Sequence, residues 1–145
     1  MKLKKNLSAI FVSLFIIMQS QAQNTINVTA TVSISDWGTG YNVYVSFTPT
    51  VNITSWSIVI NAPDAQLSAT SLNLWCAIYT VSGTQYTFTP VNYNATVPAN
   101  QPVTFGFTVD GVSSTTPRIS AGDVIAATGI TADNPNSKAV FSAYW

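Results

Sequence analysis

The chain has 145 residues, with five Lys or Arg, five Asp, no Glu, no His and one Cys. This length corresponds to one domain at most. Without His, and with a single Cys, the chain lacks the usual ligands of zinc, copper and non-haem iron and the partners of Ser-His or Cys-His nucleophiles, so no metal site and no cofactor is expected. Paired carboxylates would have to come from five scattered Asp, and we therefore predict that the protein is not an enzyme and has no catalytic residues.

Residues 1–22 have the features of a secretory signal peptide. Three lysines among the first five residues precede an apolar run, 7–18, and Ser20 and Ala22 are small residues suited to cleavage after Ala22. The apolar run is too short to cross a bilayer as a helix. We expect a secreted, extracellular protein that begins at residue 23.

Removal of the signal changes the charge. Two basic residues then stand against five Asp, for a net charge of −3. Nucleic acids and anionic membranes are recognised by basic surfaces, so neither is an expected partner. The one thiol, Cys76, predicts either a buried apolar side chain or a spare thiol able to pair between chains. The fold must therefore depend on a hydrophobic core, and we expect a monomer.

The remaining chain is rich in Thr, Val and Ile, which favour strands. Alternation of apolar and polar residues predicts seven strands, at 26–34, 41–48, 55–61, 74–81, 85–89, 103–109 and 123–128. Between two of them, Ser82-Gly83-Thr84 predicts a tight hairpin. Short strands at this spacing predict an all-β fold, a single antiparallel β-sandwich of immunoglobulin-like or jelly-roll-like type, over residues 23–128. Residues 129–145 are expected to form a C-terminal extension with one further strand at 139–144.

The aromatic residues fall into two groups. Trp56 shares a strand face with Ile58 and Ile60, which assigns it to the core. Trp37 lies in a turn signal, and Trp75 follows a polar stretch.

Tyr93 lies in a polar loop, where a core does not need a ring. Exposed on one side, Trp37, Trp75 and Tyr93 would form an apolar patch of the kind that marks binding sites. Taken singly, each ring has an alternative interpretation, in which it packs in the core or at the rim of the core and does not bind a ligand. Rings on strands two apart would lie about 10 Å from one another.

Several motifs together resemble the family 2 carbohydrate-binding modules. They are Trp37-Gly38-Thr39-Gly40-Tyr41, Ser55-Trp56, Trp75 with Gly83, Asn92-Tyr93-Asn94, Val97-Pro98-Ala99 and Phe105-Gly106-Phe107. The resemblance covers about 27–125 and implies a non-catalytic β-sandwich that adsorbs to cellulose or, in one branch, to xylan. It implies that Trp37, Trp75 and Tyr93 form a coplanar binding face and that Asn73 hydrogen-bonds a sugar hydroxyl.

One feature departs from the resembled pattern. The family usually carries a disulfide that joins the ends of the module, and this chain has no Cys near Asn27 or after Pro117. We expect the terminal residues 144–145 to pack on the sandwich in its place, the alternative being a contribution to a binding surface.

Three candidate N-glycosylation sites are Asn27, Asn52 and Asn94. A glycan on Asn94 would crowd Tyr93.

The sequence thus predicts a secreted protein that binds crystalline cellulose in plant cell walls through a planar aromatic face. The alternatives are a secreted interaction protein that binds a cell-wall or host protein, and a module for xylan, chitin or a soluble glycan.

Overall fold

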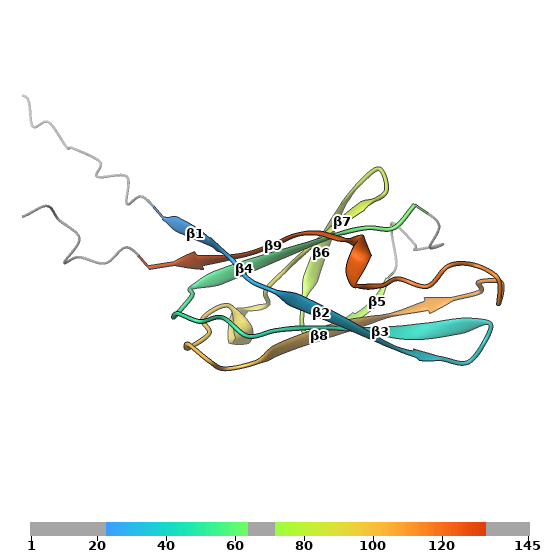
Figure 1. The fold of residues 1–145 in the computed structure, drawn as a ribbon, viewed down its shortest axis with the longest axis horizontal. Coiled ribbons are helices and arrows are strands. Elements are labelled where there is room, and N and C mark those ends of the chain that lie inside the picture. The colour runs from blue at the N-terminus through green and yellow to red at the C-terminus, as the bar shows by residue number, and fades with distance from the viewer. Residues whose placement is uncertain (1–22, 64–71, 133–145) are drawn as a thin grey trace, which may run out of the picture.

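The computed structural model describes residues 23–63 and 72–132, which form nine strands and two short 3-10 helices. The strands make two antiparallel sheets that lie one on the other, as Figure 1 shows. In spatial order the five-stranded sheet contains β1 (Asn24–Asn27), β9 (Val124–Thr131), β4 (Ser55–Asn61), β7 (Gln85–Thr89) and β6 (Ile78–Ser82). The four-stranded sheet contains β2 (Ala30–Asp36), β3 (Gly40–Phe47), β8 (Val103–Asp110) and β5 (Asn73–Trp75). The helices are η1 (Asn92–Asn94) and η2 (Ala121–Asp123). The predicted antiparallel β-sandwich is confirmed.

The core lies between the two sheets. Alternate residues of β3 and β8 are buried and face the buried positions of β4 and β7. Trp56 is 1% exposed, and its indole stacks on the ring of Phe105 with centroids 5.4 Å apart. Its Nε1 donates to the carbonyl oxygen of Asn94 at 2.9 Å, so the polar atom of this buried ring has a partner. The assignment of Trp56 to the core is confirmed.

Two of the predicted strands were wrong in extent, because each is divided between the sheets. The predicted strand 26–34 is β1 followed by β2, and these pair with β9 and β3 respectively. In Figure 1 the chain runs on from β1 into β2 as it passes from one sheet to the other. The alternation of residue types continues through the crossing, so the pattern does not reveal it.

The predicted strand 74–81 is divided in the same way, into β5 and β6. Cys76 interrupts it with a φ of 62°, a left-handed conformation that a strand does not contain. Cys76 is partly buried and free, and it carries the chain from one sheet to the other.

The other predicted elements agree with the structure more closely. The strands at 41–48, 55–61, 85–89 and 103–109 correspond within one residue to β3, β4, β7 and β8. The hairpin between β6 and β7 is confirmed, with Gly83 at a φ of 61°. The strand predicted at 123–128 continues to Thr131, because its last residues pair with β1. The further strand predicted at 139–144, the packing of 144–145 and the signal at 1–22 lie outside the described residues.

The two ends of the described chain are joined by hydrogen bonds. β1 pairs with the end of β9 from Asn24 opposite Thr131 to Asn27 opposite Thr128. The Thr131 hydroxyl also donates to the Asn24 carbonyl at 3.1 Å. This pairing fastens the ends of the sandwich, the part that a disulfide secures in the resembled family.

Candidate functional site

The outer face of the four-stranded sheet carries the side chains that point away from the core. Strand register places them in rows across the sheet. One row contains Tyr44, Gly106 and Trp75, and the next contains Asn42, Thr108 and Asn73. Trp37 follows at the end of the sheet, in the turn between β2 and β3.

The indole of Trp75 lies over the backbone of Gly106 on the neighbouring strand. A Cβ at Gly106 would overlap the ring, so only glycine allows this close approach. Trp75 also contacts Tyr44, with ring centroids 5.8 Å apart and planes at 60°. The two contacts fix the indole against the sheet and leave it partly buried.

Trp37 repeats this arrangement on its own hairpin. Its backbone N–H donates to the Gly40 carbonyl at 3.0 Å, and a Cβ at Gly40 would overlap its indole. The side chain is nevertheless 48% exposed, so much of the ring is open to a ligand. Two indoles are thus laid on glycine backbone at two places on one sheet.

The two glycines under the indoles lie on adjacent strands of the sheet. Gly40 pairs with Asp110, and Gly106 lies four residues back along β8, so the two glycines that the indoles cover are offset by roughly 13 Å along the strands. The sequence predicted about 10 Å across the sheet. That spacing assumed rings on strands two apart, whereas these glycines lie on neighbouring strands and are offset lengthwise.

Tyr93 belongs to the short helix η1 and is 76% exposed. The Asn94 side chain holds this turn: its Oδ1 accepts from the Val91 N–H at 3.0 Å, and its Nδ2 donates to the Cys76 carbonyl at 2.7 Å. A hydrogen bond with the Cys76 side chain is the main reason that the pKa of Tyr93 is raised above its ordinary value. Because Cys76 directly follows Trp75, Tyr93 lies near the end of β5 that carries Trp75. The coplanarity of all three rings stays a prediction.

A row of amide and hydroxyl groups lies between the two indoles. The Thr108 hydroxyl donates to Asn42 Oδ1 at 2.8 Å, and Asn73 Nδ2 lies 3.5 Å from Thr108 Oγ1. Asn73 is exposed, on the same face as Trp75 and two residues before it. Such groups offer both donors and acceptors, as sugar hydroxyls require.

Sequence reasoning missed Tyr44, Asn42 and Thr108. The signal for Tyr44 was available, because it interrupts the polar side of a strand whose apolar side holds Tyr41 and Val43. Asn42 and Thr108 carried no such signal, since polar residues on an outer sheet face are ordinary.

The three sequon asparagines have different surroundings. Asn27 is exposed in β1, and Asn52 is exposed while its Oδ1 accepts from the Ala99 N–H at 2.8 Å. The Asn94 amide is engaged at both its oxygen and its nitrogen. Modification of Asn94 would therefore disturb the turn that carries Tyr93.

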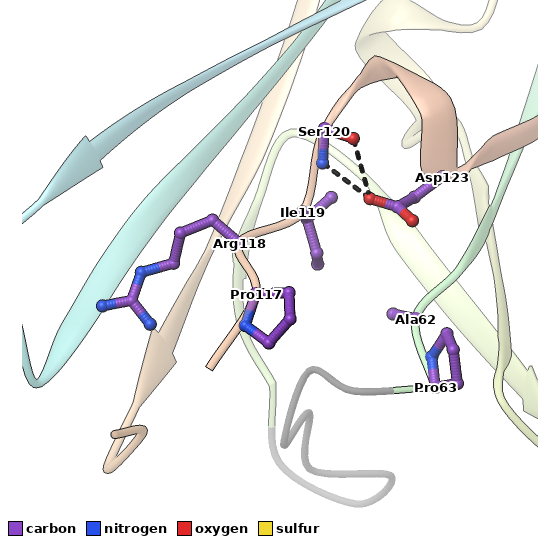
Figure 2. Close-up of a pocket in the computed structure, with 7 residues that line it drawn as sticks. All are labelled: Ala62, Pro63, Pro117, Arg118, Ile119, Ser120 and Asp123. Carbon is purple, nitrogen blue, oxygen red and sulfur yellow. Dashed lines mark hydrogen bonds between the residues drawn. The ribbon is translucent and has the colours of Figure 1, made fainter. Parts of the chain in front are cut away.

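A small cavity lies elsewhere in the fold and is shown in Figure 2. Its volume is about 180 Å³, and its lining residues are Ala62, Pro63, Pro117, Arg118, Ile119, Ser120 and Asp123. The Asp123 carboxylate accepts from the Ser120 backbone at 2.8 Å and from its hydroxyl at 3.1 Å. This acid is occupied in capping η2. Within the part of the chain that the structure describes, no cluster of acidic or Cys side chains is grouped to hold a metal, and no helix is long and apolar enough to cross a membrane.

The sandwich and its outer face of indoles and amides define a carbohydrate-binding module with an aromatic surface cluster. Residues 26–129 match the family described as "Cellulose binding domain", and the chain belongs to this family. Polysaccharide binding follows from that membership.

The chain was also compared with solved structures. Chitinase ChiA74 from Bacillus thuringiensis superposes with a TM-score of 0.52 at 22% identity, over 71% of this chain and 15% of that chain. The chain thus spans a small part of that chitinase, and the likeness concerns the fold alone. The chitin-binding domain of Chi18aC from Streptomyces coelicolor gives a TM-score of 0.48 at 26% identity, over 74% of this chain and 93% of its own. The chitin-binding domain of a Pyrococcus furiosus chitinase gives a TM-score of 0.46 at 25% identity, over 68% of this chain and 98% of its own. None of the curated proteins compared with this chain matches it.

Proposed function

We propose that the protein is a secreted, non-catalytic module that adsorbs to crystalline cellulose through Trp37, Trp75 and Tyr93, with Asn73 beside them. The observation that carries this proposal is that two indoles lie over glycine backbone on one outer sheet face. An indole held down on the sheet offers an apolar surface of low relief, which suits the flat surface of a solid.

The affinity of such a face follows from the chemistry of the sugar ring. The axial C–H groups of a glucose unit form an apolar patch, and an aromatic ring laid against it removes apolar surface of both partners from water. If about 50 to 80 Å² is covered per ring, each ring contributes roughly 1 to 2 kcal/mol. Since the rings are fixed before binding, little internal entropy is lost on association.

The row of polar side chains between the two indoles would orient the bound polysaccharide chain. Asn42, Thr108 and Asn73 lie where the stretch of polysaccharide between the two ring contacts would pass. Their amides and hydroxyl would bond the sugar hydroxyls along the chain and favour one direction of the polymer over others.

Secretion belongs to the same proposal and has its own test. Residues 1–22 would be removed on export, so mass spectrometry of the exported protein should show Gln23 at its N-terminus. A protein recovered outside the cell with residues 1–22 intact would contradict this part.

The binding experiment is depletion of the purified protein from solution by microcrystalline cellulose, with chitin and insoluble xylan in parallel. Chitin is included because it offers the same ring faces to stacking. Trp37→Ala, Trp75→Ala and Tyr93→Ala should each lose about 1 kcal/mol or more of binding free energy. Ile78→Ala is the matched control, because Ile78 is an apolar side chain, 58% exposed, on the other sheet.

The outcomes separate the candidates. Preferential depletion by cellulose supports the proposal, and preferential depletion by chitin moves the ligand to that polymer. Strong competition by short soluble oligosaccharides would indicate a soluble-glycan module. A folded protein that stays in solution with every solid would leave a protein partner in the cell wall as the remaining candidate.

A further inference from the structure

We propose that Arg118 is a positioning residue for Trp37, holding the turn on which this indole is presented to the polysaccharide. The inference rests on the proposed function, because it takes Trp37 as a binding ring. Arg118 lies 82 residues after Asp36 in the chain, in the loop that precedes η2. No motif in the sequence connects Arg118 with the aromatic face.

Arg118 contacts both residues that flank Trp37. Its Nε and Nη2 donate to the two carboxylate oxygens of Asp36 at 2.6 and 3.2 Å, a bidentate pair. Nη2 also donates to the Gly38 carbonyl at 2.8 Å. The guanidinium therefore spans the backbone on either side of the indole.

The turn itself is closed by a second set of bonds. The Gly38 N–H donates to Asp36 Oδ1 at 2.7 Å, and the φ of Gly38 is 92°, in the region that favours glycine. The Val112 N–H donates to the Thr39 carbonyl at 3.1 Å, from the same loop that carries Arg118. A glycine-rich turn has wide backbone freedom when alone, and these contacts remove it.

The Arg118 guanidinium is itself held in place by further contacts. Nη1 donates to the carbonyls of Ser113 and Thr116 at 3.1 and 3.2 Å, and the group lies 4.8 Å from the centroid of the buried Tyr41 ring. The Arg118 side chain is 14% exposed. Figure 2 shows it directed away from Asp123, so it does not serve the cavity that it borders. Every nitrogen of the guanidinium has a partner, and these partners belong to the turn or to its own loop.

The contacts of Arg118 on either side of Trp37 should affect the binding free energy of this ring. Immobilising a free side chain and its turn on association costs free energy, and a ring already fixed avoids that cost. Without Arg118 the indole would keep its chemistry but lose its fixed place. We therefore expect the contribution of Trp37 to fall while that of Trp75 is unchanged.

The test is a double-mutant cycle on the full chain, measured by adsorption to microcrystalline cellulose and chitin. The four proteins are the parent, Arg118→Gln, Trp37→Ala and the double variant. Arg118→Gln should weaken binding roughly threefold to tenfold in the parent and have no further effect once Trp37 is absent. Asp123→Asn is the control, since it changes one charge near the same loop and keeps an acceptor for Ser120; it should bind as the parent does.

A spectroscopic measurement separates positioning from general destabilisation. In ¹⁵N-labelled protein, the indole N–H signal of Trp37 is assigned by its loss in Trp37→Ala. Arg118→Gln should shift or broaden that signal and leave the signal of Trp56, whose indole is bonded in the core, where it was.

Each outcome decides a different point. Equal weakening by Arg118→Gln with and without Trp37, or unchanged binding together with an unmoved Trp37 signal, overturns the inference. Trp37→Ala that binds less well while Arg118→Gln binds as the parent does overturns the inference and leaves the proposed function standing. A parent protein that adsorbs to neither solid overturns the proposed function, and the inference with it.

Discussion

Trp75 lies with its indole on the backbone of Gly106, one strand away, and no other residue type at position 106 leaves room for it. The pair explains why a glycine stands between Phe105 and Phe107, both of which are buried in the core. The inner side of β8 contributes to the core of the sandwich, while its outer side at Gly106 leaves room for the Trp75 indole, which we propose contacts the polysaccharide.

Gly106→Ala should weaken both the fold and the binding of polysaccharide. The added methyl group would meet the Trp75 indole and the Val43 carbonyl oxygen, and overpacking of this kind costs about 1 to 3 kcal/mol. In a Trp75→Ala background the same substitution should cost less, since one of the two obstacles is gone. The measurement is urea unfolding of the parent, Gly106→Ala, Trp75→Ala and the double variant, which gives the free energy of unfolding of each. Costs that simply add would show that ring and glycine do not interact.

Tyr44 should support Trp75 through its ring and not through its hydroxyl. An aromatic pair of this kind is worth about 0.5 to 1.5 kcal/mol, whereas the Tyr44 hydroxyl is 3.5 Å from Asn42 Nδ2. Tyr44→Ala should therefore weaken adsorption several-fold, and Tyr44→Phe should bind nearly as the parent does. Adsorption isotherms decide between them. Equal losses in the two variants would assign the role to the hydroxyl.

Asn94→Asp should loosen the turn that carries Tyr93. The change keeps an acceptor for the Val91 N–H but replaces the donor to the Cys76 carbonyl with an oxygen, which leaves two acceptors facing each other. We expect a loss of about 1 to 3 kcal/mol in the free energy of unfolding, with weaker adsorption. The control is Asn92→Asp, an exposed position of the same helix. If both variants unfold alike, the Asn94 amide does not hold the turn.

The ion pair of Asp36 and Arg118 predicts a dependence of stability on pH. The Arg118 guanidinium, and next the Gly38 N–H, hold the pKa of Asp36 below its ordinary value of 3.8. A carboxyl with a lowered folded-state pKa stabilises the fold above the unfolded value, and this contribution is lost as the pH falls through the folded value. The pKa of Arg118 is raised by the same bond, and burial raises that of the neighbouring Tyr41, so both keep their ordinary charge in this range.

Asp36→Asn should therefore lower Tm at pH 7, and the difference from the parent should close in the acid range below pH 3.8. The measurement is thermal unfolding followed by circular dichroism, at pH 7 and at a pH below 3.8. The exposed Asp110 gives the control, since Asp110→Asn removes one charge at the same end of the sheet. A Tm difference for Asp36→Asn that persists unchanged into acid would mean that the carboxylate charge is not what stabilises the turn.

What the sequence by itself determined is local. The alternation that buries Trp56 and Ile58 defines β4, and the glycines at the hairpins end the strands beside them, because side-chain direction and turn geometry depend on neighbouring residues. The candidate rings Trp37, Trp75 and Tyr93 could also be chosen from sequence, since each interrupts a stretch with no need of an apolar side chain.

The tertiary structure alone decided which segments meet. Nothing in the alternation marks the place where the chain passes from β1 to β2, because a strand looks the same in either sheet and only its pairing partner differs. The bonds of Arg118 to Asp36 likewise join residues 82 positions apart. Such contacts depend on how two sheets are stacked and connected, and it is these contacts that hold the aromatic face in place.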